Sequence, residues 1–272
     1  MRLGPYILGA VLALASSAVF AKDGSGGIPD LRIARAEGDI VAAWLIAPTK
    51  RYEHFVLGSR YEAGGLRVRL KDGSTADLML PENAVFEDRT PRIADLNGNG
   101  RNEVILVKSR LDVGSSLAIV GLKAGKPAIL AETPPNGRPR RWLNPAGIGD
   151  FLANGKLQVA IVRMPHLAGK LEFWSFDKGR LKNEGALVKV SNHQIGSRHQ
   201  GLSTVLRRRQ GGDLLVIPSF DFRSLKVIAA TPAPHEVASY ALADKVAGDL
   251  SIRNGVASVP LASGRIQRIS LK

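Results

Sequence analysis

The chain has 272 residues, no cysteine and a formal net charge of +14, from 38 Lys and Arg residues against 24 Asp and Glu residues. The lack of cysteine excludes disulfides, cysteine zinc sites and a cysteine nucleophile, so packing alone must hold the core. The positive charge favours anionic partners such as lipid headgroups, acidic polysaccharide or cell-wall polymers, although it also serves solubility. No helix-turn-helix, zinc-finger or RNA-binding signature occurs, so a specific nucleic-acid partner is not expected.

Residues 1–21 are predicted to form a secretory signal peptide. A positive start at Arg2 precedes an apolar run over residues 6–15, and small residues stand before Lys22. The run is too short for a membrane span, and no later segment is long enough, so none is expected after cleavage. An uncleaved N-terminal anchor is the alternative. The mature protein is therefore expected in the periplasm or the extracellular medium.

The remaining chain divides into a short linker and one domain. Residues 22–29 (KDGSGGIP) are rich in glycine and are predicted to be a flexible linker. Residues 30–272 consist of short runs rich in Val, Ile and Leu, punctuated by Gly, Pro, Asn and Asp, so few helices are expected. We treat residues 30–272 as a single domain.

One nine-residue pattern recurs in this domain at intervals of about 55 residues. It reads DLNGNGRNE at 95–103, DFLANGKLQ at 150–158 and LRRRQGGDL at 206–214, and an apolar run follows each copy. Self-similarity at a fixed period of this size indicates a repeat architecture.

Alignment of the copies predicts four strands per repeat. The matched strands are 91–94, 146–149 and 202–205; 104–107, 159–162 and 214–217; 117–122, 171–176 and 225–229; and 128–130, 187–190 and 237–240. The runs at 40–46, 66–70 and 76–80 fit an earlier repeat, and those at 246–252, 256–260 and 265–271 fit a shortened final one.

Four-stranded units repeated radially are typical of a β-propeller. We therefore expect an all-β fold, a β-propeller of about five four-stranded blades. Residues 31–36 (LRIARA) are expected to complete the last blade, so that the N-terminal segment closes the ring. A pair of stacked sandwiches or an open solenoid is the alternative.

The first copy of the pattern is a candidate calcium loop. The side chains of Asp95, Asn97 and Asn99 can converge on one cation, joined by the backbone carbonyl of Arg101 and by Glu103. Calcium takes about six to eight oxygen ligands of this kind. An EF-hand is excluded because the twelfth position is apolar and the loop joins two strands. A plain hairpin loop whose Asp and Asn side chains cap their own backbone is the alternative.

An apolar strand, the pattern D-x-[DN]-G-[DN]-G-x-x-[DE] and a second apolar strand together resemble the FG-GAP or VCBS-type repeat of integrin-like β-propellers, of an exported bacterial type with mostly degenerate repeats. The resemblance covers roughly residues 89–230. It implies a calcium ion in the loop between neighbouring strands. The second copy keeps Asp150 but has Leu152 and Gln158 at positions three and nine, and the third copy is basic. The resemblance therefore implies one calcium at most, in a site that supports the fold.

A second group of candidate residues falls in loops that a four-stranded blade places on the opposite face. These loops contain two arginine groups, four of the five histidines and two aromatic residues. Guanidinium groups bind carboxylate or phosphate, and aromatic rings offer flat surfaces for a sugar ring or acyl chain. The alternative is that the loops are simply polar and the aromatic residues are packing anchors. The candidate ligand-binding residues are Arg51, Tyr52, His54, Arg140, Arg141, Trp142, His166, His193 and Arg198.

These observations predict an exported, calcium-stabilised β-propeller that acts as a binding or interaction module. Its basic loop face would meet an anionic ligand, a polysaccharide or a protein partner, and its charge allows electrostatic association with a membrane surface. The alternative is a periplasmic hydrolase or lyase that uses the loop histidines. No HExxH, G-x-S-x-G, P-loop or G-x-G-x-x-G motif supports catalysis.

Overall fold

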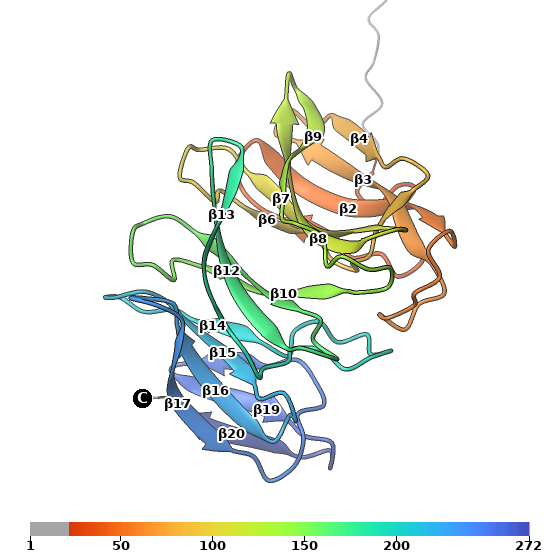
Figure 1. Ribbon diagram of the computed structural model, residues 1–272. Coiled ribbons are helices and arrows are strands. Elements are labelled where there is room, and N and C mark those ends of the chain that lie inside the picture. Colours follow the sequence, from red (N-terminus) through yellow and green to blue (C-terminus); the bar gives the residue numbers. More distant parts are fainter. Residues whose placement is uncertain (1–21, 272) are drawn as a thin grey trace, which may run out of the picture.

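The computed structural model describes residues 22–271, in which all regular structure is β and the named strands pair antiparallel (Figure 1). The prediction of an all-β fold is confirmed. The predicted signal peptide, residues 1–21, lies outside the described residues. Among the residues described, none belongs to a helix that could cross a membrane.

The strands form consecutive sheets in chain order. The first sheet contains β1 (Ala34–Arg35), β2 (Ile40–Thr49), β3 (Glu62–Leu70) and β4 (Thr75–Met79). The second contains β6 (Arg92–Ala94), β7 (Glu103–Arg110), β8 (Gly114–Lys123) and β9 (Lys126–Glu132). A short strand, β5 (Ala84–Phe86), pairs with both β3 and β7, so β1 to β9 form one continuous nine-stranded sheet, and the first and second sheets are its two halves.

The remaining sheets repeat the same order. The third contains β10 (Leu143–Gly149), β11 (Gln158–Arg163), β12 (Lys170–Asp177) and β13 (Arg180–Leu187). The fourth contains β14 (Thr204–Leu206), β15 (Leu214–Pro218), β16 (Ser224–Ala229) and β17 (His235–Ala241). The fifth contains β18 (Ser251–Arg253), β19 (Val256–Pro260) and β20 (Ile266–Ser270).

The N-terminal strand belongs to the first sheet, which corrects the expectation that residues 31–36 complete the last blade. Ala34 pairs with Ala43 and Arg35 pairs with Ala42, so β1 lies against β2. Only residues 36–39 separate the two strands, and the Ala36 N–H donates to the Val41 carbonyl at 3.1 Å. A connection this short folds the chain back as a hairpin, which commits β1 to its sequence neighbour.

The hydrophobic core lies between consecutive sheets. One cluster of buried side chains joins the first sheet to the second, and three more join the second to the third, the third to the fourth and the fourth to the fifth. β11 is therefore buried along its whole length, whereas the outer strand β17 has only exposed and partly buried residues. Central strands covered on both faces read as continuous apolar runs, which is why they were the clearest sequence signal.

Each recurring nine-residue loop lies between the first and second strands of one sheet and is hydrogen-bonded to the preceding sheet. The residue at position eight of each copy donates its backbone N–H to the loop of the preceding sheet. Asn102 donates to the Asp39 carboxylate at 2.8 Å, Leu157 to the Leu96 carbonyl at 3.0 Å, and Asp213 to the Asp150 carbonyl at 2.8 Å. The copies thus form a chain of loops along one side of the molecule, including the basic third copy.

Residues 22–29, predicted to be a flexible linker, are packed against the first sheet. Ile28 is buried and its N–H donates to the Leu45 carbonyl at 3.1 Å. The Trp44 indole N–H donates to the Ser25 carbonyl at 3.1 Å. Glycine content predicted mobility, but the segment has a backbone partner and an apolar anchor, and these hold it in place.

Candidate functional site

The loops that carry the predicted ligand-binding residues meet on one side of the sheets. The Arg140 backbone N–H donates to the Tyr52 hydroxyl oxygen at 2.9 Å, which links the connection before β10 to the loop after β2. The Trp142 ring lies nearly parallel to the His166 ring at 6.1 Å and meets the His193 ring edge-on at 4.7 Å. The tertiary structure therefore gathers these five residues, which lie far apart in the sequence.

The aromatic members of this group are interior residues. Trp142 is 2% exposed and Tyr52 is 5% exposed. The Trp142 indole N–H donates to the Glu87 carbonyl at 3.0 Å. Burial, followed by the nearby Glu87 charge, raises the pKa of Tyr52, so its hydroxyl stays neutral. These rings pack the loops together and do not offer open surfaces to a ligand. This agrees with the alternative that the aromatic residues are packing anchors.

The predicted arginines do not converge on a cavity. The Arg51 guanidinium donates to the Ala84 carbonyl at 2.6 and 3.0 Å, which fastens its loop to β5. Arg198 is an exposed side chain that forms an ion pair with Asp30 at 3.3 Å. The cavities described below are lined by residues other than Arg51, Arg140, Arg141 and Arg198.

Two buried glutamates, Glu62 and Glu87, organise the same region, and no sequence pattern pointed to them as a pair. His54 Nδ1 lies 2.5 Å from Glu87 Oε1, and the Ser109 hydroxyl donates to Glu87 Oε2 at 2.5 Å. The Glu62 carboxylate accepts the His54 backbone N–H at 3.2 Å. Burial, opposed by backbone hydrogen bonds and reinforced by Glu87, raises the pKa of Glu62. His54 is thus held by acids and is not free for a ligand.

The other two histidines form a directed hydrogen-bond chain. His193 Nε2 faces the Ser197 carbonyl oxygen at 3.0 Å and must therefore carry the proton. In a neutral ring His193 Nδ1 is then an acceptor, so His166 Nε2, at 2.9 Å, is the donor. His166 Nδ1 is left unprotonated. Burial lowers the pKa of His193 to about 3, with nearby His166 adding to the shift. Burial, followed by the neighbouring His54, lowers that of His166 to about 4.

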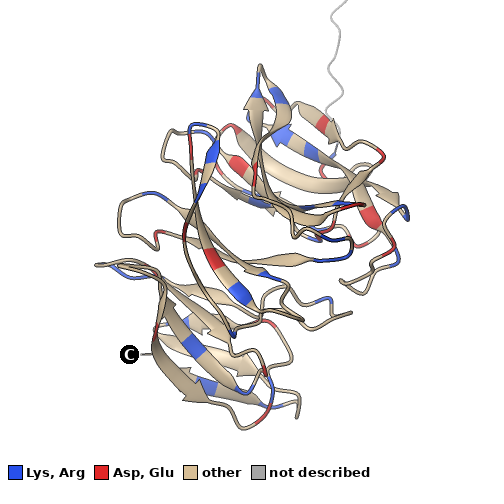
Figure 2. Cartoon of the chain, viewed as in Figure 1, with Lys and Arg blue, Asp and Glu red and all other residues tan. Residues whose placement is uncertain are grey.

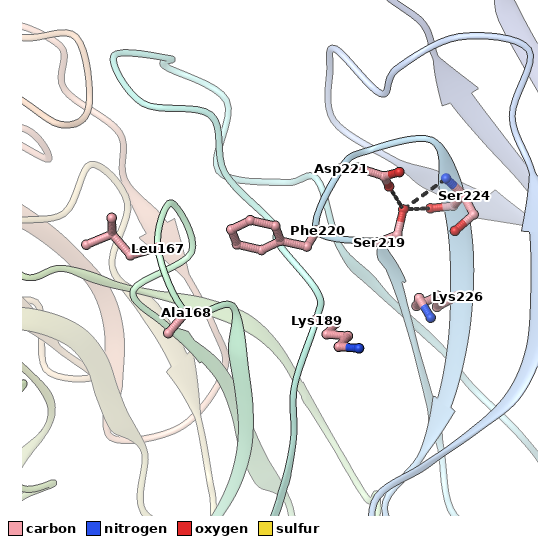
Figure 3. A pocket seen from close by; sticks show the side chains of 8 residues that line it. All are labelled: Leu167, Ala168, Lys189, Ser219, Phe220, Asp221, Ser224 and Lys226. Atoms are coloured by element: carbon pink, nitrogen blue, oxygen red, sulfur yellow. Dashed lines mark hydrogen bonds between the residues drawn. The ribbon is translucent and has the colours of Figure 1, made fainter.

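An open groove lies next to this histidine pair, between loops of the third and fourth sheets. A cavity of about 330 Å³ is lined by His166, His193, Ile195, Phe220 and Lys245, among others. A second cavity of about 590 Å³ adjoins it at Phe220 (Figure 3) and is lined by Leu167, Ala168, Lys189, Ser219, Phe220, Asp221, Ser224 and Lys226. We call the two together the inter-sheet groove.

The inter-sheet groove is basic and apolar. Leu167, Ile195 and Phe220 are 60%, 72% and 38% exposed. Within residues 22–271 no acid forms an ion pair with Lys189 or Lys245. Figure 2 shows Lys and Arg spread over all the sheets, so charge alone does not mark this groove. The inter-sheet groove is distinguished by its combination of unpaired ammonium groups and exposed apolar side chains.

The single acid of the groove is already engaged. The Asp221 carboxylate accepts the Ser219 hydroxyl at 2.5 Å and the Arg223 backbone N–H at 3.2 Å. The Ser219 hydrogen bond, followed by the Arg223 N–H, lowers the pKa of Asp221. This loop was not predicted from the sequence, because the candidate residues on the second face were chiefly histidines and arginines. The available signal was Phe220, an aromatic residue within a turn between two strands.

The candidate calcium loop is held by its own hydrogen bonds. The Asp95 carboxylate accepts the backbone N–H groups of Gly98, Asn99 and Gly100 at 2.7–3.1 Å. Glu103 is buried and accepts the Leu96 N–H at 2.9 Å. Burial raises the pKa of Glu103 to about 7, opposed by that N–H and reinforced by the Asp95 charge.

The second copy of the loop has the same internal pattern without the full set of candidate ligands. The Asp150 carboxylate accepts the N–H groups of Asn154 and Gly155, each at 2.9 Å. The Asn154 side chain accepts the Lys156 N–H at 3.0 Å, as Asn99 accepts the Arg101 N–H at 2.8 Å in the first copy. In both loops, Asp and Asn side chains cap the backbone of their own loop, as expected for the alternative of a plain hairpin loop. In the described part of the chain, no three His, Asp or Glu side chains are grouped to hold a metal.

No family model and no curated protein matches the chain. Among solved structures, the chain is similar to exotype rhamnogalacturonan lyase YesX, with a TM-score of 0.46 and 14% sequence identity. The match covers 91% of this chain and 59% of that protein's chain. At this level of similarity it assigns neither an activity nor a substrate to the protein.

Proposed function

We propose that the protein is an exported binding module whose inter-sheet groove takes an acidic protein segment with apolar anchor residues. The observation that carries this proposal is the placement of Leu167, Ile195 and Phe220, all exposed, in the same groove as the unpaired Lys189 and Lys245. Apolar side chains that a monomer leaves exposed around a hollow are typical of protein interaction sites.

A protein segment fits this groove better than a polysaccharide. Two of the three exposed apolar residues, Leu167 and Ile195, are aliphatic, and an aliphatic surface matches the side chains of a peptide. Asp221, which could accept sugar hydroxyls, is already engaged by Ser219 and Arg223. The unpaired lysines would attract the acidic residues of the segment and increase the rate of association.

The proposed architecture is a five-bladed propeller in which loop contacts cross from the connection before the fourth sheet to the first sheet. The connection between the third and fourth sheets reaches back to the first. The Gly196 N–H donates to the Val56 carbonyl at 2.8 Å, and Arg198 forms an ion pair with Asp30. These contacts support a radial arrangement, because they bring together loops of sheets that are not neighbours in the chain order.

The proposal is tested by charge reversal in the groove. The probes are peptides that alternate Asp or Glu with Leu or Phe, with alginate as the polysaccharide comparison. We expect Lys189→Glu and Lys245→Glu each to weaken peptide binding by about 5- to 10-fold in fluorescence anisotropy, since an exposed charge pair contributes modestly. Lys123→Glu, an exposed lysine on β8 outside the groove, is the matched control.

Three results would contradict the proposal. Equal weakening by Lys123→Glu would mean that only diffuse charge acts. Binding of alginate but not of peptides would assign the groove to polysaccharide. Unchanged peptide binding by Phe220→Ala would show that Phe220 is not an apolar anchor, because burying a residue of this size at an interface contributes on the order of 1 kcal/mol or more.

The hydrolase or lyase alternative retains one supporting observation. His166 Nδ1 is a neutral acceptor at the groove, and its partner His193 fixes that protonation state. Such a nitrogen could take a proton from a substrate. His166→Gln should then abolish turnover, whereas a binding module should show only a graded loss of affinity.

A further inference from the structure

We propose a second binding site, in a separate cavity where the first strands of the second, third and fourth sheets approach one another, for a small carboxylate or phosphate anion. This cavity has a volume of about 420 Å³. It is lined by Arg92, Pro145, Ala146, Gly147, Ile148, Gln200, Ser203, Thr204, Val205 and Arg207. The two arginines come from β6 and from the loop after β14, and no acidic residue is part of the lining.

Each arginine is oriented by a buried carboxylate outside that lining. Arg92 forms an ion pair with Asp88 at 2.8 Å, and the Asp88 side chain is fully buried. Arg207 forms an ion pair with Asp213 at 2.6 Å, and its second terminal nitrogen donates to the Ile148 carbonyl at 2.8 Å. Carboxylates of this kind hold a guanidinium in one orientation. The arginine side chain is therefore already ordered before a ligand binds, which lowers the entropy cost of binding.

Donor groups of the two arginines remain for a ligand. Arg92 uses one terminal nitrogen, for Asp88 and the Thr90 carbonyl. Its Nε and second terminal nitrogen have no acceptor among residues 22–271, and neither does Nε of Arg207. Guanidinium donors suit the oxygen atoms of carboxylate and phosphate. Thr204 also lines the cavity, and its hydroxyl is a neutral donor.

Two glycines of β10 make room for this arrangement. A Cβ atom at Gly149 would lie 3.2 Å from the terminal nitrogen of Arg207 and 2.9 Å from the Asp213 carboxylate. A Cβ atom at Gly147 would lie 2.7 Å from the Val205 side chain. The bare backbone at Gly149 lets Arg207 lie across β10, and at Gly147 it gives room to the Val205 side chain. The sequence Gly147-Ile148-Gly149 therefore has a physical role at the cavity that the repeat pattern did not reveal.

The test uses citrate and inorganic phosphate as probes, at constant ionic strength, with affinity measured by isothermal titration calorimetry. We expect saturable binding of at least one probe, weakened about tenfold by Arg207→Gln, as for the loss of one charge-assisted hydrogen bond. Arg209→Gln is the matched control, because Arg209 is exposed in the same loop but does not line the cavity. It should change the affinity less than twofold.

Two further variants make the result decisive. Arg92→Gln should weaken binding by a similar factor. Arg92→Gln and Arg207→Gln each strip a partner from a buried carboxylate, Asp88 and Asp213 respectively, so the folding of both variants must be checked by thermal melting. Lys189→Glu, in the inter-sheet groove, should leave probe binding unchanged and so separates this site from the proposed function. The absence of saturable binding, or equal weakening by Arg207→Gln and Arg209→Gln, would overturn the proposal.

Discussion

His166 and His193 show how burial sets the protonation of single residues in this protein. Their pKa values in the folded protein are about 4 and about 3, against about 6.5 in an unfolded chain. As the pH falls below 6.5, the unfolded state therefore binds protons that the folded state excludes. Stability from this pair is fully present above pH 6.5 and is lost as the pH falls toward the folded values.

His166→Gln tests this linkage. Glutamine can still donate to His193, so the variant should fold, but one titrating group is removed. We expect the free energy of unfolding to fall less steeply between pH 6.5 and pH 4 than in the wild-type protein. Urea denaturation at pH 7, 5.5 and 4.5 measures this. His235→Gln, at an exposed histidine, is the control, and identical slopes for His166→Gln and wild type would disprove the effect.

At the scale of the elements, the recurring nine-residue loops both cap their own backbone and bond to the neighbouring sheet. In the first and second copies an aspartate caps the backbone of its own loop, and in all three copies the N–H at position eight bonds to the preceding loop. Calcium binding in the first copy remains a prediction. It would require a charged Glu103, whose raised pKa of about 7 favours the protonated form below that pH.

Asp95→Ala and Asp150→Ala form a matched pair that separates capping from calcium binding. Without calcium, each should lose about 1 kcal/mol of stability, because each removes a capping carboxylate. With calcium, the wild type and Asp150→Ala should gain melting temperature, more at pH 8 than at pH 6, whereas Asp95→Ala should not. Differential scanning fluorimetry with calcium or a chelator measures this, and a wild-type melting curve indifferent to calcium would eliminate the site.

At the scale of the whole molecule, the connection between the third and fourth sheets contacts a loop of the first sheet. Gly58, in the first sheet's long loop, has a positive φ of 69°. A Cβ atom there would lie 2.4 Å from the Gly196 carbonyl oxygen. Contacts between such distant segments cost chain entropy and are formed only when the sheets are assembled.

Gly58→Ala tests that contact. Gly137 also has a positive φ, 85°, but a Cβ atom there meets nothing within 4 Å. Both alanine variants carry the same backbone strain, so we expect Gly58→Ala to lose at least about 1 kcal/mol more in the free energy of unfolding than Gly137→Ala. Equal losses in urea denaturation would mean that the two loops do not touch in solution.

The strands were more predictable from the sequence than the site. Buried strands such as β7 and β11 are continuous apolar runs between glycine and asparagine turns, and their repeat at a constant interval identified the units. The roles of Tyr52 and Trp142 were not predictable, because an aromatic residue in a loop can face a ligand or the interior. Only the neighbouring loops decide, and here they bury both rings.

The sequence by itself determined the all-β class, the four-stranded repeat and the recurring loop, because alternation, turn residues and periodicity are local properties of a chain. Tertiary structure decided what depends on distant segments. It placed β1 in the first sheet, joined Glu62 and Glu87 around His54, and formed the inter-sheet groove at Phe220. These features arise from the packing of whole sheets against one another, and the spacing of residues along the chain does not encode which of their loops will meet.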